Sequence, residues 1–318
     1  MPGIPLVTIG IANHNYARFV TQALDSAASQ TYENCELIIV DDCSNDDSVE
    51  VIQKWIEGYC GNFKIMFIQN EENYGVAKVS GLILERASGK YYQILDADDV
   101  ILPEKIAHQV SILEQKENSA LVYSNTFVIN EHNEIQDDYL HRIGYSPALM
   151  AEGMVFNELL RFNFIPNSSV LIRTALAKRI GGYDPLFQVQ DYYLYLTLSE
   201  HFPFSYSRCI SACYRVHSGS LSNTFQSNRK SIEGTLQLQM IYYSKGNEKA
   251  KESVRKSIFN MAPYFYKHHF SNTFYWLKKN LQLNPGIKSF VYFAAFNLRV
   301  PYSFFDQIKS AFVTKKYT

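Results

Sequence analysis

The chain has 318 residues, of which 47% are hydrophobic and 19% charged, and its formal net charge is −1. This length allows one large domain or a domain with an accessory segment, and the apolar content excludes wholesale disorder. The net charge conceals two different parts, because residues 1–224 carry 15 Lys or Arg against 27 Asp or Glu, whereas residues 225–318 carry 15 against 4. Such an asymmetry predicts a different partner for each part.

Targeting signals and disulfide patterns are not recognisable in the sequence. The first ten residues lack the basic and apolar regions of a secretory signal. The longest apolar run after residue 225, residues 290–296, is too short to span a bilayer. The five cysteines include no C-x-x-C pair, which indicates reduced thiols rather than a disulfide framework or a zinc site. We therefore expect a cytoplasmic protein.

The first 130 residues alternate between strand-like and helical patterns. Strands are predicted at residues 6–11, 36–40, 63–68, 91–95 and 121–128. Helices are predicted at residues 17–30 and 49–58, from the turn at 73–75 to Gly89, and from a first turn that contains Pro103. This alternation predicts βαβ units and a mostly parallel sheet, in which ligands bind outside the carboxyl ends of the strands.

The rest of the chain is less regular and changes in composition near residue 225. Helical patterns occur at residues 150–162, 173–180 and 190–201, and a strand-like run ends at 214–217. After residue 225 the pattern is helical, with breaks expected at Pro263, Pro285 and Pro301. We therefore expect two domains, residues 1–224 and residues 225–318.

Acidic clusters follow two of the predicted strands. Asp96, Asp98 and Asp99 come directly after residues 91–95, and such crowded carboxylates suit Mg²⁺ or Mn²⁺ with positions left open for phosphates. They equally suit a solvated loop that caps the next helix, although the position at a strand end favours the metal. Asp42, after residues 36–40, suits a base or a ribose, and a helix-capping loop is the alternative.

Two further residues have a chemical and a purely structural interpretation. Asp191 begins an aromatic helix, where it is either a catalytic carboxylate or a favourable charge at the positive end of the helix dipole. His217, in YRVHSGS, is either a metal ligand or an ordinary hydrogen-bonded histidine. No G-x-G-x-x-G follows the first strand and no P-loop motif occurs, which counts against NAD(P) enzymes and P-loop NTPases.

Taken together, these stretches resemble the inverting family 2 glycosyltransferases with the GT-A fold, over residues 5–222. The resemblance rests on several motifs that occur in the expected order: VTIGIANHNYARFVTQALDSAASQTYENCELIIVDDCSNDDS, NYGVAK, YYQILDADDVILPEKI, SSVLIRTALAKRIGGYD, QDYYLYLTL and YRVHSGSLS. It implies an α/β fold with a Rossmann-like, mostly parallel central sheet and flanking helices, followed here by a C-terminal helical segment.

The resemblance also implies a set of residues that bind a nucleotide-sugar donor. Asp42 would recognise the base, and the backbone near Ala12 and Asn13 would line the same pocket. Asp96 would contact the ribose. Lys78, at the end of the NYGVAK motif, is a further donor-binding candidate.

The remaining implied roles concern the metal and the reaction. Asp98 would hold Mn²⁺ or Mg²⁺ with support from Asp99, and His217 would be a further ligand. Arg215 would offset pyrophosphate charge. Asp191 would be the general base that activates an acceptor hydroxyl.

Three positions depart from the family pattern. Cys43 stands where the family often has Gly, so the turn after Asp42 is expected to differ. Gln190 replaces the acidic residue that precedes the base, which leaves the base less crowded by negative charge. Ser80-Gly81 replaces an Arg-Asn pair of many relatives, which puts donor contacts from that turn in doubt.

These features predict an enzyme that transfers a sugar from a nucleotide-diphosphate donor to a glycan or a lipid-linked glycan. A UDP-sugar donor is expected from its frequency in the family. One alternative is a sugar-nucleotide nucleotidylyltransferase, but the glycine-rich basic loop of such enzymes is absent after the first strand. The other is a non-catalytic binding or assembly subunit, which the retained carboxylates disfavour.

Residues 225–318 lie outside the resemblance and hold 20 aromatic residues. Basic and aromatic side chains together suit an anionic membrane surface, here the inner face of the cytoplasmic membrane. They also suit a helical subdomain whose aromatic side chains pack on the catalytic core, and the sequence leaves both open. We expect no nucleic-acid partner.

Overall fold

The computed structural model describes residues 3–145, 151–187, 189–220, 225–245, 248–268 and 272–303. Its contacts divide the chain into two compact units, Met1–Gly234 and Thr235–Thr318. This division falls inside a helix and not at residue 224, where the composition changes. Within the described residues, no helix combines the length and the apolar character needed to cross a bilayer.

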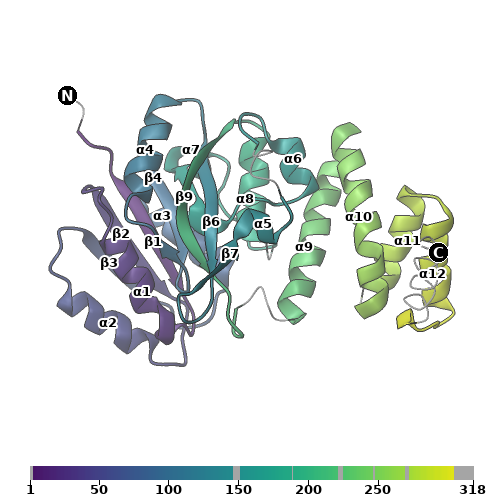
Figure 1. The fold of residues 1–318 in the computed structure, drawn as a ribbon, viewed down its shortest axis with the longest axis horizontal. Coiled ribbons are helices and arrows are strands. Elements are labelled where there is room, and N and C mark those ends of the chain that lie inside the picture. Colours follow the sequence, from purple (N-terminus) through teal and green to yellow (C-terminus); the bar gives the residue numbers. More distant parts are fainter. Residues whose placement is uncertain are drawn as a thin grey trace. The chain divides into compact units, whose positions relative to one another are not determined.

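In the described part of the first unit, nine strands form one mixed sheet (Figure 1). Their order is β3-β2-β1-β4-β8-β6-β9-β5, and β7 pairs with β6. The strands are β1 (Val7–Asn13), β2 (Cys35–Asp41), β3 (Lys64–Gln69), β4 (Tyr91–Asp96), β5 (Val100–Ile101), β6 (Leu121–Ile129), β7 (Ile135–Asp138), β8 (Leu171–Arg173) and β9 (Phe204–Arg215). Strands β3, β2, β1 and β4 are parallel neighbours, and so are β6 and β9, whereas the short strand β8 runs antiparallel between β4 and β6.

Helices cover both faces of the parallel part of this sheet. Val7, Ile9 and Ile11 of β1 pack into a core with apolar side chains of α1 (Ala17–Ala28), α2 (Ser48–Gly58) and α4 (Lys105–Gln115). The intervening residues of β1 point to the opposite face, where α3 (Val76–Arg86) lies. Gly10 permits a close approach there, because a Cβ atom at this position would lie 2.2 Å from Ile83 Cγ2. The predicted α/β architecture with flanking helices is confirmed.

The second half of this unit consists of short elements that surround β6 and β9. They are α5 (Tyr139–Arg142), α6 (Phe156–Arg161), the 3-10 turn η2 (Asn167–Ser169), α7 (Thr174–Arg179) and α8 (Gln190–Ser199). The predicted helix at 150–162 is thus shorter in the structure, and residues 146–150, just before it, lie outside the described residues.

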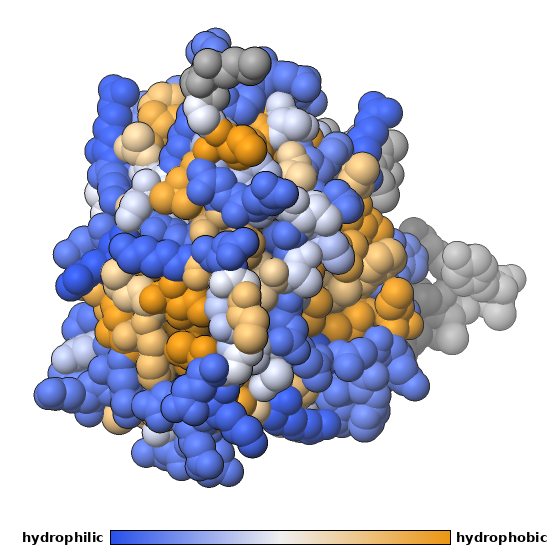
Figure 2. Space-filling view, turned by 90° about the vertical axis from the view of Figure 1, so that its left-hand side faces the viewer, coloured by the Kyte–Doolittle hydropathy of each residue, from blue (hydrophilic) through white to orange (hydrophobic). Residues whose placement is uncertain are grey.

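The sheet ends on one side at the edge strand β3. Its four central residues, Ile65 to Ile68, are apolar and half-buried. Figure 2 views the molecule from the side on which β3 lies in Figure 1, and it shows hydrophobic side chains exposed between hydrophilic ones. This edge therefore remains partly apolar at the surface.

The second unit is helical. It comprises the end of α9 (Phe225–Ser244) together with α10 (Glu248–His268), α11 (Thr273–Leu283) and α12 (Ile287–Asn297). Pro285 separates α11 from α12 as predicted, but the break predicted at Pro263 is wrong, because α10 continues through that residue. Burial of Ala262, Phe265 and Tyr266 around the proline offsets the hydrogen bond that it removes from the helix.

Candidate active site

The carboxyl ends of β1, β2, β4 and β9 carry most of the residues selected from the sequence. Parallel pairing puts Ala12 of β1 level with Asp96 of β4. Asp42 follows β2, and its N–H donates to Asn13 O (2.8 Å). Arg215 is the last residue of β9. Because parallel strands end at the same edge of a sheet, residues from distant parts of the sequence meet there.

The Asp42 carboxylate is buried and holds the segment that leads into α3. Its Oδ1 accepts hydrogen bonds from Asn70 Nδ2 (2.8 Å) and Tyr74 N (3.0 Å), and its Oδ2 accepts one from Gly75 N (2.8 Å). A carboxylate offers about four acceptor positions, so one remains for a ligand. Asn70 and Tyr74 were not selected from the sequence, although both lie in the polar NEENYG stretch before the helix.

Asn13 sits beside a second carboxylate at the same strand ends. Its Nδ2 donates to Asp41 Oδ2 (2.7 Å), which also accepts a hydrogen bond from Ser44 Oγ (2.6 Å). Asn13 Oδ1 is buried and has no hydrogen-bond partner. A buried acceptor of this kind is costly unless a ligand or a water donates to it.

Lys78 lies in the first turn of α3, and its exposed side chain extends over the ring of Tyr74, with Nζ 5.3 Å from the ring centroid. Because Tyr74 N also bonds to Asp42, the cation and the carboxylate flank the same short segment. The structure therefore brings Lys78 near the expected base pocket, as a rim residue.

Cys43 occupies a left-handed backbone conformation, with φ of 58°. This conformation costs a residue other than glycine about 1–2 kcal/mol. We expect Cys43→Gly to raise the free energy of unfolding by about 0.5–1 kcal/mol after the greater flexibility of glycine in the unfolded chain is counted. Cys43→Val should lower it by about 1–3 kcal/mol, because a β-branched residue fits this region poorly.

Urea denaturation of the three proteins measures these differences. Cys60→Gly is the control, since Cys60 is exposed and has no positive φ. It should not stabilise the protein. Equal destabilisation by both glycine substitutions would contradict the strain argument.

Asp98 and His217 face each other across the ends of β4 and β9. His217 Nε2 lies 3.1 Å from Asp98 Oδ2, and both side chains are largely buried. The imidazole packs between the rings of Tyr16 and Phe19, with centroid distances of 5.7 and 4.7 Å. Gly219 N donates to His217 Nδ1 (3.2 Å), which fixes the ring orientation.

Asp99 points elsewhere. Its Oδ1 accepts a hydrogen bond from the backbone N–H of Arg215 (2.8 Å). This bond ties the acidic turn, residues 96–99, to the end of β9. Among the residues that the structure describes, no group of three or more His, Cys, Asp or Glu side chains is arranged to hold a metal ion. The three-ligand set of Asp98, Asp99 and His217 is therefore not assembled, and only Asp98 and His217 converge.

Arg215 is completely buried, and its guanidinium bonds to protein acceptors. Nε donates to Asp98 O (2.7 Å), and Nη1 donates to Asn130 O (3.0 Å) and Asn133 Oδ1 (2.7 Å). Nη2 donates to Gln22 Oε1 (2.8 Å). Four of the five guanidinium N–H groups are thereby used. The expected pyrophosphate contact is not what this geometry favours, because the group is turned into the protein.

The acidic turn has strongly perturbed protonation equilibria. Burial, and then the neighbouring Asp98 and Asp191 charges, raise the pKa of Asp96 to about 7. Burial also raises the pKa of Asp98, and it raises the pKa of Asp99 well above its ordinary value. Negative charge is thus crowded into a poorly solvated space, where a bound cation would lower the cost of ionisation.

Asp191 lies in the first turn of α8, where its Oδ1 accepts a hydrogen bond from Tyr192 N (2.7 Å). Burial raises its pKa above the ordinary value for aspartate. One helical turn further, Tyr195 Oη donates to Asn167 Oδ1 (2.8 Å), and Asn167 Nδ2 donates to Asp96 Oδ2 (3.3 Å). The helix of Asp191 is thereby linked to the carboxylate that ends β4.

The sequence analysis missed Tyr195 and Asn167. Tyr195 stands four residues after Asp191, on the same side of the helix, which was the available signal. Asn167 lies in η2, in the stretch IPNSS, and nothing in its sequence context indicates its partners.

Lys105 is a buried lysine that joins α4 to β4, and it was also missed. It is 2% exposed, and its Nζ donates to Gln109 Oε1 (2.8 Å), Val170 O (3.1 Å) and Gln93 Oε1. These acceptors belong to α4, β4 and the residue after η2. Burial lowers its pKa well below that of a free lysine.

Comparison with known families shows which family the chain belongs to. The sequence matches the family model described as glycosyl transferase family 2 over residues 8–180, more than half of the chain. The chain belongs to glycosyl transferase family 2. It is therefore a glycosyltransferase, as predicted.

Two curated relatives of this glycosyltransferase come from Escherichia coli. It is 31% identical over 218 residues to UDP-Glc:alpha-D-GlcNAc-diphosphoundecaprenol beta-1,3-glucosyltransferase WfaP, a match that covers 68% of this chain and 80% of WfaP. It is 26% identical over 220 residues to WfgD, which carries the same enzyme description, and this match covers 69% and 80% of the two chains.

Solved structures of similar fold include S. aureus TarS 1-349 in complex with UDP-GlcNAc, with a TM-score of 0.63 at 15% identity, covering 91% of this chain and 79% of that one. The mannosyltransferase PcManGT from Pyrobaculum calidifontis, in complex with GDP-Man and Mn²⁺, has a TM-score of 0.60 at 16% identity, covering 97% and 85%. These matches confirm the GT-A fold.

The Asp98–His217 pair of this glycosyltransferase fits a divalent cation. Neighbouring ligands of an octahedral Mg²⁺ or similar ion lie about 3 Å apart, which is close to the Oδ2–Nε2 distance of 3.1 Å. A carboxylate oxygen with an imidazole nitrogen suits Mn²⁺, and their burial restricts competition from water. The same two atoms form a hydrogen bond when no ion lies between them.

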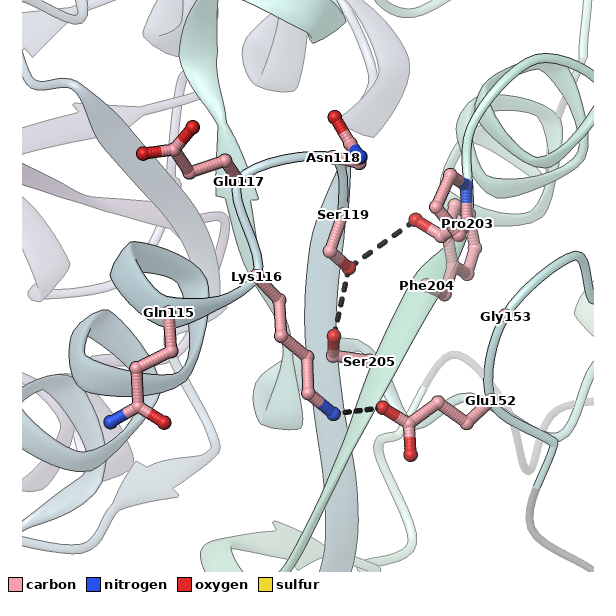
Figure 3. A pocket seen from close by; sticks show the side chains of 10 residues that line it. All are labelled: Gln115, Lys116, Glu117, Asn118, Ser119, Glu152, Gly153, Pro203, Phe204 and Ser205. Carbon is pink, nitrogen blue, oxygen red and sulfur yellow. Dashed lines mark hydrogen bonds and ion pairs between the residues drawn. The ribbon is translucent and has the colours of Figure 1, made fainter.

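A hollow of about 430 Å³ lies at the opposite edge of the sheet, where β6 and β9 begin (Figure 3). Lys116 and Glu152 form an ion pair across it, and Ser205 Oγ donates to Ser119 Oγ (2.9 Å). None of the residues selected from the sequence lines this hollow. It is therefore separate from the candidate active site of the glycosyltransferase.

Proposed function

We propose that the protein is an inverting, metal-dependent glycosyltransferase that moves a sugar from a UDP-sugar to a lipid-linked glycan. The observation that carries the proposal is the meeting of Asp96, Asp98, His217 and the Asp191 helix at one edge of the sheet. The descriptions of WfaP and WfgD support the UDP-sugar and the diphosphoundecaprenol-linked acceptor. TarS in complex with UDP-GlcNAc supports a uridine nucleotide on this fold.

The donor would lie along the ends of β1, β2 and β4. The free acceptor position of Asp42 and the unpartnered Asn13 Oδ1 can each accept an N–H from a nucleobase. Asp96 would accept from a ribose hydroxyl, and Lys78 at the rim would add positive charge. Ala12 contributes backbone to the same edge.

Asp98 and His217 would hold Mn²⁺ or Mg²⁺ through Oδ2 and Nε2. When bound, the ion offsets the negative charge that develops on the departing nucleoside diphosphate. Asp99 and Arg215 would not contact the ion or the donor. Each would hold the acidic turn in place through the hydrogen bonds described above. We therefore assign Arg215 to positioning and not to direct pyrophosphate binding.

Asp191 would perform the proton transfer. Its carboxylate accepts the proton of an acceptor hydroxyl while that oxygen bonds to the anomeric carbon. The bond from this carbon to the phosphate oxygen breaks on the opposite side, and the electron pair leaves with the nucleoside diphosphate. One displacement inverts the anomeric configuration without a covalent glycosyl-enzyme.

Calorimetric titration with UDP, GDP and CDP, each with Mn²⁺ or with EDTA, tests this assignment. We expect UDP to bind in the presence of Mn²⁺, and Asp98→Asn to weaken that binding by about tenfold or more because one of two converging ligands loses its charge. Asp47→Asn should bind as the unmodified protein does, because Asp47 is exposed and makes no side-chain capping bond.

The outcomes separate the parts of the proposal. Binding of GDP or CDP in place of UDP would change the donor. Equal binding of UDP with EDTA and with Mn²⁺ would contradict the metal-dependent part of the proposal. If no nucleotide binds under either condition, the edge of the sheet is not a donor site and the proposed function is wrong.

The place of action follows from the proposed acceptor. A lipid-linked glycan resides in a membrane, so we propose that the enzyme works at the inner face of the cytoplasmic membrane through residues 225–318. The catalytic domain would end, and the membrane-facing domain begin, near the composition change at residue 224.

A further inference from the structure

The helical unit after Gly234 exposes apolar side chains beside basic ones. Ile287 is 85% exposed, Leu298 76%, Phe290 59% and Phe274 48%. These four residues are called the apolar face below. Single exposed apolar side chains are ordinary on protein surfaces, but a contiguous group marks a site of interaction.

The members of the apolar face adjoin one another. Ile287, Phe290, Ala294 and Leu298 follow at intervals of three or four residues, so they share one side of α12. Phe274 of α11 lies next to α12, since its ring centroid is 5.6 Å from that of Phe293, a side chain that also packs against the core of the unit. The face is therefore formed by two helices of one unit.

Helix α12 presents a different side to the interior of its unit. Ser289 and Ala295 are buried, and Tyr292 and Phe296 pack against the core formed by Ala262, Tyr266 and Leu277. The helix is thus apolar on both its inner and outer sides. A helix of this kind normally has a partner on each side.

Basic residues surround the apolar face, and acidic residues are missing from the sequence around it. Residues 253–305 contain seven Lys or Arg and no Asp or Glu. Lys278 lies one turn after Phe274, Lys288 follows Ile287 and Arg299 follows Leu298, and all three are exposed. Long basic side chains can keep their charges in water while the neighbouring apolar groups are buried.

A hollow of about 540 Å³ opens at the start of α12, beside Ile287. Its polar lining consists of Lys256, Asn260, Asn284, Lys288 and Ser289. Lys256 Nζ is paired with Glu252 Oε1 (2.6 Å), and Asn284 Nδ2 donates to Arg255 O (2.9 Å) and Asn280 Oδ1 (3.0 Å), so Lys288 and Asn260 remain as the donors of this lining. Ammonium and amide N–H groups are the donors that phosphate oxygens accept best. An anionic headgroup could therefore lie in this hollow while the apolar face contacts acyl chains.

We infer that α11 and α12 dock this glycosyltransferase on an anionic phospholipid bilayer through the apolar face. Apolar and aromatic side chains enter the interface, and Lys278, Lys288 and Arg299 lie among the headgroups. This inference rests on the proposed function, because a lipid-linked acceptor places the reaction at such a surface. It adds the residues that make the contact.

Sedimentation with vesicles tests the inference on the full-length chain. We expect the protein to bind vesicles that contain phosphatidylglycerol more tightly than pure phosphatidylcholine, and to dissociate as NaCl rises. Joint replacement of Ile287 and Phe290 by Ser should reduce the partition coefficient by about tenfold or more, since two apolar side chains lose their burial in lipid. Lys278→Glu with Lys288→Glu should reduce binding chiefly at low salt.

The matched control is the joint replacement of Ile135 and Met154 by Ser. These residues are 59% and 58% exposed and lie in the first unit, so the control also removes two exposed apolar side chains. It should bind vesicles as the unmodified protein does. Equal loss in both double variants would overturn the inference, and so would failure of the unmodified protein to bind anionic vesicles.

Two further measurements distinguish membrane docking from dimerisation and from misfolding. If the unmodified protein is a dimer by sedimentation velocity and the Ile287/Phe290 variant is a monomer, the apolar face joins two copies of the chain and the membrane inference is wrong. Nucleotide titration without vesicles tests the catalytic site alone. A variant that binds UDP normally but not vesicles shows that loss of docking does not reflect misfolding or failure of the proposed function.

Discussion

Asp191→Asn should lower kcat by about 10²–10⁴-fold, because an amide cannot take the proton from the acceptor hydroxyl. Nucleotide affinity should stay within about twofold, since the expected metal ligands are untouched and the amide keeps an oxygen for Tyr192 N–H. The measurement is sugar transfer from the donor identified by titration to a lipid-linked acceptor, followed with a radiolabelled sugar. A comparable loss of nucleotide binding would instead give Asp191 a role in donor binding.

The pH dependence of the unmodified enzyme provides a second signature of this base. Asp191 must be ionised to accept a proton, and burial raises its pKa above the ordinary value. Activity should therefore fall as pH falls through that raised pKa, so the acidic limb of the kcat profile lies above about pH 4. In Asp191→Asn the contribution of Asp191 to this limb should disappear, whereas that of Asp96, whose pKa is raised to about 7, should remain.

Asp184→Asn is the matched control for both experiments. Asp184 precedes Asp191 by seven residues, and its Oδ1 accepts a hydrogen bond from Leu186 N (2.9 Å). An amide oxygen can still accept that bond, so kcat should change little. A large loss in this variant too would mean that any change in the segment before α8 disturbs catalysis.

Arg215→Lys should lower the free energy of unfolding by about 2–4 kcal/mol, although it keeps the positive charge. A lysine ammonium cannot reach the four acceptors that the guanidinium joins, which are Asp98 O, Asn130 O, Asn133 Oδ1 and Gln22 Oε1. Buried acceptors without donors account for the loss. Urea denaturation measures it, and Mn²⁺-dependent nucleotide binding should weaken as well because the acidic turn loses a support.

Arg208→Lys provides the comparison on the same strand. Arg208 is exposed, so its replacement should change stability by less than about 0.5 kcal/mol. If Arg215 instead contacts the pyrophosphate directly, Arg215→Lys should lose donor affinity while its stability equals that of the unmodified protein. That result would contradict the positioning role.

The strand ends could be predicted from the sequence because their signals are local. Short apolar runs ended by Asp42 or by the acidic turn at Asp96 specify both a strand and its boundary. The predicted strand at residues 36–40 is Cys35–Asp41 in the structure, and the one at 91–95 is Tyr91–Asp96. Parallel connection of these units then places their ends together without further information.

The orientation of individual side chains could not be predicted, since their partners lie far away in the sequence. Arg215 was expected to offset pyrophosphate charge, yet Gln22, 193 residues away, accepts one of its hydrogen bonds. Asn167 and Asp96 are 71 residues apart. Pro263 shows the converse, because a local rule predicted a break that tertiary packing overrides.

The close contact at Gly10 links the proposed donor site to a residue outside it. A methyl group there would collide with Ile83 and push α3 away from β1. The start of α3 is attached to Asp42 through Tyr74 and Gly75. If Asp42 binds the base as we propose, the shape of that pocket depends on how closely α3 packs on β1, and substitutions in the middle of a strand would change nucleotide preference.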